Sequence, residues 1–150
     1  MTRHTEKGQR FEFLVERMDT SRDEGYYIES MAIAYALLEE RTYSLLDKLN
    51  IRYDSRHEKL YQCLKKVETN VVQQNISIEN ANEIIDFLQQ DLIDSDLLDN
   101  IQTWREKRND VIHDLAKETI AYESLEPYSI EGCELFRKYS AMIMRLKKKI

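Results

Sequence analysis

Apolar residues recur every three or four positions along almost the whole chain, and this period matches an α-helix rather than a strand. The longest stripe consists of Ile28, Met31, Tyr35, Leu38, Thr42, Leu45 and Leu49. Only three glycines and one proline occur among 150 residues, so few residues suit hairpin turns. The expected fold class is therefore all-α.

The same spacing divides the chain into six helices. They are expected at about residues 9–19, 23–50, 54–74, 79–90, 95–120 and 127–149. The first is short, Thr20 to Asp23 supplies capping residues for the second, and Pro127 suits the first turn of the last. Short connections between long amphipathic helices favour antiparallel neighbours. We expect one domain over residues 1–150, an up-and-down antiparallel helical bundle of five to six helices.

Several functional classes are disfavoured by what the sequence lacks. No run approaches ~18 consecutive apolar residues and the first residues lack an apolar signal core, so we expect a cytoplasmic protein without membrane contact. The two cysteines, Cys63 and Cys133, lie apart in apolar settings and are expected to be buried thiols rather than a disulfide. Isolated glycines make no phosphate loop and no ligand spacing suggests zinc, so neither a cofactor nor a metal is expected.

The net charge of −6 argues against a protein that coats nucleic acid by bulk electrostatics, but the charges are unevenly distributed. Residues 79–99 carry seven acids and no base, whereas residues 137–150 carry six bases and no acid. An RNA would avoid the first segment and could follow the second. Alternatively, both runs are solvated faces, and the cations complement the dipole at the end of the last helix.

An unusual group of polar residues lies in the fifth expected helix, within WREKRNDVIHDLAKE at residues 104–118. The stripe of this helix passes through Leu97, Ile101, Trp104, Arg108, Val111 and Leu115. Arg108 therefore stands where a leucine is usual, and a guanidinium there must be paired or face a cleft. Asn109 and His113 share one face, but Arg108 and His113 are about 140° apart around the axis. Two copies packed about a two-fold axis could bring the arginine of one beside the histidine of the other.

The pattern Arg108-Asn109-x-x-x-His113 resembles the R-x4-6-H motif of HEPN domains, in which a polar residue typically follows the arginine. The all-helical sequence resembles that superfamily along most of the chain. The resemblance implies a homodimer whose two motifs form one RNA-cleaving cleft. Members of the superfamily act in CRISPR-associated defence, toxin–antitoxin systems, abortive infection and RNA processing. The resemblance also implies that an antitoxin or a regulatory protein could be a partner.

The chemistry of metal-independent RNA cleavage suits these residue types. The ribose 2′-hydroxyl must lose a proton and the leaving 5′-oxygen must gain one, transfers that imidazoles perform near neutral pH. Arg108 would stabilise the charge on the phosphate oxygens. Asn109 would position the phosphate or orient His113, and the two copies of His113 would divide the acid and base roles. The hydrolase products would be a 2′,3′-cyclic phosphate and a 5′-hydroxyl.

Other interpretations of the same residues remain open. Arg108 could form a buried ion pair with Glu29 or Glu39, or Glu39 could hold it in place for catalysis. The chain could be this ribonuclease, a non-catalytic HEPN-type helical interaction or RNA-binding module, or a helical bundle of unrelated ancestry in which the motif occurs by chance. The resemblance also has a departure, because Leu115 occupies the place of the tyrosine that is modified in some HEPN toxins. Modification at that position is therefore excluded.

Tyrosines are frequent in the first half of the chain and allow two roles. The group comprises Tyr26, Tyr27, Tyr35, Tyr43, Tyr53 and Tyr61. Such side chains could stack on RNA bases, but at helical spacing they more often border a core or a dimer interface.

Overall fold

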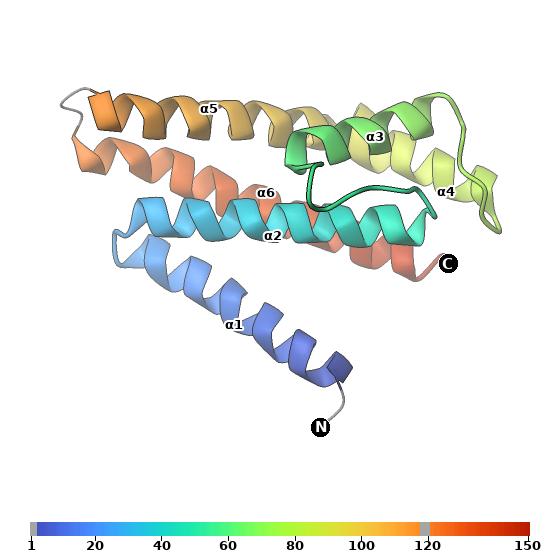
Figure 1. The fold of residues 1–150 in the computed structure, drawn as a ribbon, viewed down its shortest axis with the longest axis horizontal. Helices are drawn as coiled ribbons and strands as arrows, with labels where there is room; N and C mark the ends of the chain where they lie inside the picture. The colour runs from blue at the N-terminus through green and yellow to red at the C-terminus, as the bar shows by residue number, and fades with distance from the viewer. Residues whose placement is uncertain (1–2, 118–120) are drawn as a thin grey trace.

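The computed structural model describes residues 3–117 and 121–150, and in this part of the chain it confirms an all-α helical bundle (Figure 1). The helices are α1 Arg3–Asp23, α2 Tyr27–Lys48, α3 Leu60–Val72, α4 Ala81–Leu88, α5 Leu97–Lys117 and α6 Glu126–Lys147. A π-helical segment, Gln89–Asp94, follows α4, and a 3₁₀ turn, Tyr122–Leu125, precedes α6. Residues 118–120, expected at the end of the fifth helix, lie outside the described residues.

The first helix is much longer than the sequence analysis predicted. Residues 20–23, expected to cap the second helix, instead form the last turn of α1. Packing explains this extension, because Met18 and Ser21 are both buried and keep the end of α1 against the bundle. The reversal comes later, at Gly25, whose φ of 85° is a conformation that glycine adopts without strain. The prediction for Pro127 is confirmed, since it lies in the first turn of α6.

Two central helices contribute the largest shares of the core. Helices α2 and α6 pack along each other, with α1 on one side and α3 and α5 on the other (Figure 1). From α2, Leu38 and Leu45 are fully buried, and from α6, Met142 and Ile143 are fully buried. The alternation of helix direction is interrupted where α4 continues through the π-helical segment into α5, and again between α2 and α3 (Figure 1). The connection after α2 runs back along the bundle, so that α3 runs in the same direction as α2 (Figure 1).

Helices α5 and α6 approach closely where an indole meets a glycine. Trp104 is fully buried, and its Nε1–H donates a hydrogen bond of 2.8 Å to the carbonyl oxygen of Tyr128. A Cβ at Gly132 would collide with the indole ring. This glycine is therefore required by close packing between two helices.

The expectation for the cysteines is confirmed, because Cys63 and Cys133 are free and buried. Burial raises the pKa of the Cys63 thiol to about 11, and it also raises the pKa of the Cys133 thiol. Among the described residues, no helix combines the length and apolar character that a membrane crossing requires.

Candidate functional site

The two halves of α5 lie in different surroundings. All of its buried residues, Leu97, Leu98, Ile101 and Trp104, belong to its first half. Helix α3 covers this half, since Gln102 donates a hydrogen bond of 3.2 Å to the carbonyl of Tyr61, near the beginning of α3. No residue of α5 after Trp104 is buried. The motif predicted from the sequence therefore lies on the part of α5 that extends beyond α3.

Arg108 is half-buried beside α2. Its guanidinium carbon lies 4.6 Å from the centre of the Tyr35 ring, within cation–π range. One of its Nη atoms donates a hydrogen bond of 3.0 Å to the side-chain oxygen of Asn109. Its Nε–H is buried and has no hydrogen-bond partner among the described residues. Burial, the largest influence, lowers the pKa of the Arg108 guanidinium, and no described carboxylate forms an ion pair with it.

The ion pairs proposed for Arg108 do not form within the described chain. Glu29 pairs with Arg17 at 2.9 Å. One Glu39 oxygen instead accepts a hydrogen bond of 3.1 Å from the backbone N–H of Leu60, at the beginning of α3. A helix N-terminus attracts a carboxylate because its first N–H groups lack partners within the helix. This local demand draws Glu39 away from the arginine.

Glu39 nevertheless acts on Tyr35, whose ring lies against the Arg108 guanidinium. Burial raises the pKa of the Tyr35 hydroxyl, and the negative charge of Glu39 raises it further. The positive charge of Arg108 acts on the same hydroxyl in the opposite direction. Glu39 can thus support Arg108 only indirectly, through Tyr35 and the position of α3.

The structure brings Asn109 and Arg108 together, but it does not bring His113 to them. Asn109 and His113 are both exposed, and no hydrogen bond joins either His113 and Arg108 or His113 and Asn109 within the described chain. Val111 and Leu115 are partly buried because they pack against the core, and Ile112 beside the motif is also only partly buried. One protomer therefore offers a cation without a carboxylate partner and a separate imidazole.

Sequence reasoning missed the aromatic supports of the arginines on α5. Arg105 lies 4.9 Å from the ring centre of Tyr61 on α3, much as Arg108 lies over Tyr35 on α2. The sequence does indicate that the two arginines lie close together, because residues 105 and 108 are three apart and share a helix face. Their partners come from distant parts of the chain, which the helical period does not identify.

Most of the other tyrosines pack against protein. Tyr27 stacks on Tyr122 with ring centres 5.5 Å apart, and Tyr43 stacks on Tyr53 at 5.0 Å. Burial raises the pKa of Tyr53 to about 12, and it raises the pKa of Tyr43 as well. These four rings are occupied with one another, in agreement with the packing interpretation.

The basic and acidic runs are partly paired with each other. Arg145 lies 3.5 Å from Asp91, and Lys149 lies 3.6 Å from Glu83. The C-terminal cations are thus not a continuous free track for RNA, because two of them partly neutralise the acidic segment.

Comparisons of the chain with protein family models, with characterised proteins and with solved structures gave no significant match. No cluster of three or more His, Cys, Asp or Glu side chains that could hold a metal ion occurs in the described part of the chain. The function of this protein is therefore inferred from the geometry around Arg108.

Proposed function

We propose that this protein is a metal-independent endoribonuclease of the HEPN type, with one composite site formed by two copies of the chain. The observation that carries the proposal is the state of Arg108. Its guanidinium is half-buried, is held over the ring of Tyr35, has no carboxylate partner among the described residues, and has an Nε–H without an acceptor. A buried donor without a partner is costly, and a guanidinium without a carboxylate partner is suited to hold a phosphate oxygen through its other N–H groups.

The proposed reaction needs two proton transfers and one centre of positive charge. A neutral His113 removes the proton of the ribose 2′-hydroxyl while the 2′-oxygen bonds to phosphorus. The bond from phosphorus to the 5′-oxygen breaks, and a protonated His113 of the second copy gives its proton to that oxygen. Arg108 stabilises the negative charge on the phosphate oxygens, and Asn109 holds the guanidinium in place. The products are a 2′,3′-cyclic phosphate and a 5′-hydroxyl.

The second copy is needed because of the geometry of one helix. Arg108 and His113 are five residues apart, about 140° around the axis, so one α5 directs them to different sides. Ile112 lies between Arg108 and His113 around the helix axis and is only partly buried, so a second α5 packed over it would lie beside both of them. A two-fold axis through this face would put an imidazole of one chain near the guanidinium of the other.

The test combines oligomeric state with cleavage in the absence of metal. Sedimentation should give a dimer, and the protein should cleave single-stranded RNA in EDTA, with cyclic-phosphate ends detected by mass spectrometry. Arg108→Ala and His113→Ala should each lower the cleavage rate by at least about 100-fold, the effect of losing one general acid–base or charge-stabilising group. Far-UV circular dichroism should remain unchanged.

Matched controls come from exposed positions on the same helix. Lys117→Ala removes a cation and Asp114→Ala an anion from the exposed surface of α5, and both should leave cleavage unchanged. Cleavage that survives both Arg108→Ala and His113→Ala would disprove the mechanism. A dimer that binds RNA but does not cut it would favour the non-catalytic binding module instead.

A further inference from the structure

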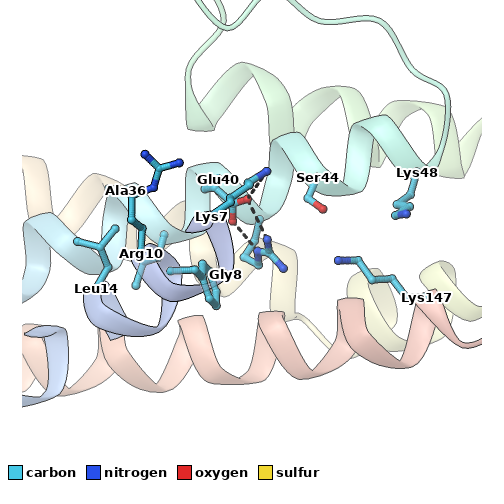
Figure 2. Close-up of a pocket in the computed structure, with 12 residues that line it drawn as sticks. Lys7, Gly8, Arg10, Leu14, Ala36, Glu40, Ser44, Lys48 and Lys147 are labelled. Atoms are coloured by element: carbon cyan, nitrogen blue, oxygen red, sulfur yellow. Dashed lines mark hydrogen bonds and ion pairs between the residues drawn. The ribbon is translucent and has the colours of Figure 1, made fainter. Parts of the chain in front are cut away.

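A second candidate site lies on the other side of α2, between α1, α2 and the end of α6. It is a cavity of about 480 Å³, a size typical of small-molecule sites. Figure 2 shows the residues that line it. Cations predominate among the described lining residues, which include Lys7, Arg10, Arg41, Lys48 and Lys147 and only one acid, Glu40. This concentration of positive charge is unexpected in a chain whose net charge is −6.

Glu40 already pairs with one of the cations, so most of the positive charge in the cavity remains available to bind an anion. Both oxygens of Glu40 accept hydrogen bonds from the neighbouring Arg41, at 2.6 and 2.8 Å. Lys7 lies 3.9 Å from the same carboxylate. The other three cations, Arg10, Lys48 and Lys147, have no ion-pair partner among the described residues.

The cations also disfavour one another. Burial lowers the pKa of the Lys147 ammonium, and the charges of Arg41 and Lys48 lower it further. Figure 2 shows Lys48 and Lys147 extending toward each other from α2 and α6. An anion between these ammonium groups would relieve the repulsion.

The end of the cavity away from Lys48 and Lys147 carries apolar lining, although Arg10 also lies there (Figure 2). Leu14 and Ala36 lie at this end. Phe11 and Leu37 add to the apolar lining, and the Arg41 guanidinium covers the Phe11 ring at 4.6 Å. From Ala36 to Lys48, α2 extends about 18 Å, roughly the length of a medium alkyl chain with its head group. The apolar side chains are therefore displaced along the cavity from Lys48 and Lys147.

We propose that this cavity binds a soluble single-chain amphiphile, with an anionic head group of the phosphate or carboxylate type between Lys48 and Lys147 and an alkyl chain along Leu14 and Ala36. An alkyl chain fits better than a nucleobase. Among the described residues, Ser44 is the only lining side chain that is both polar and uncharged, so few hydrogen-bonding groups are available to recognise the edge of a base. An RNA backbone would leave the apolar end unused. This site is separate from the ribonuclease site and does not depend on it.

The experiment titrates the full-length protein with decyl phosphate, below the concentration at which it forms micelles, and measures heat by calorimetry. Saturable one-to-one binding is expected. Inorganic phosphate should bind at least about 100-fold more weakly, because each buried methylene contributes about 0.8 kcal/mol. Equal affinity for the two ligands would contradict the proposal, as would binding to anionic vesicles without binding to free decyl phosphate.

Two variants test the two ends of the cavity. Lys48→Glu combined with Lys147→Glu should weaken decyl phosphate at least about tenfold, the effect of losing a charge-assisted contact. Ala36→Phe should also weaken it, by filling the apolar end from an exposed position on α2. The matched controls are Lys138→Glu on α6 and Ala32→Phe on α2, both exposed and outside the lining. Binding that is unchanged in the cavity variants, or equally weakened in the controls, would refute the site.

Discussion

The two halves of α5 differ in how deeply their side chains are buried. Residues 97–104 bury four apolar side chains, and Trp104 fits against α6 where Gly132 leaves space for its ring. Residues 105–117 bury none, yet they contain Arg108, Asn109 and His113. The beginning of α3 marks the boundary between the two halves. Its first residues contact Gln102 and Arg105, and α3 extends no further along α5.

This contrast separates the requirements of folding from those of function. The first half of α5 must satisfy tight packing, where small changes of volume are destabilising. The second half keeps a desolvated arginine with an unsatisfied donor, which lowers stability unless a ligand or a second chain satisfies it. A costly polar group that no neighbouring side chain compensates is typical of a site.

The largest effect is expected in the first half. Gly132→Val should lower the free energy of unfolding by about 3 kcal/mol, because its side chain would collide with the Trp104 ring. Denaturation in urea measures this change. Gly8→Ala is the control, since its Cβ would meet no other atom within 4 Å, and replacing a helical glycine should stabilise by about 0.5–1 kcal/mol. Equal stability of Gly132→Val and the wild type would contradict the close packing of α5 and α6.

A smaller loss of stability is expected at alkaline pH. It arises from Cys63 on α3, the helix that covers only the first half of α5. Burial raises the pKa of Cys63 from 9.0 to about 11, so the thiol contributes stability that is complete below pH 9 and is lost as pH rises toward 11. The free energy of unfolding should therefore fall across this window, by about 2–3 kcal/mol for this group.

The matched variant for that prediction is Cys63→Ala. Its stability should fall less steeply between pH 9 and pH 11 than that of the wild type, because buried tyrosines still titrate but the thiol is gone. Urea denaturation at a series of pH values measures both slopes. Identical slopes would show that the thiol does not contribute.

The smallest effect on stability is expected in the second half of α5. Tyr35→Leu removes the ring beneath Arg108 and should cost about 0.5–1 kcal/mol, the range for a partly exposed cation–π contact. RNA cleavage should fall by a larger factor, since the guanidinium loses its platform. Tyr35→Phe keeps the ring and should retain both properties. If Tyr35→Phe were as defective as Tyr35→Leu, the hydroxyl rather than the ring would matter.

Much of the fold could be predicted from the sequence, because the helical period is a local property. The all-α class, the approximate position of each helix, the first turn at Pro127 and the buried state of Cys63 and Cys133 all follow from spacing and residue type. The sequence also singled out Arg108 as an unusual member of an apolar stripe. These features depend on neighbours a few residues away along the chain.

Tertiary structure decided which helix faces each of these residues. Arg108 rests on Tyr35 rather than pairing with Glu39, because the beginning of α3 provides unpaired N–H groups that hold this carboxylate. Gly132 is required only because Trp104 of α5 packs against α6 at that point. The cationic cavity gathers side chains from α1, α2 and α6. A period of 3.6 residues specifies which side chains share a face, whereas the packing of the whole bundle determines what each face contacts.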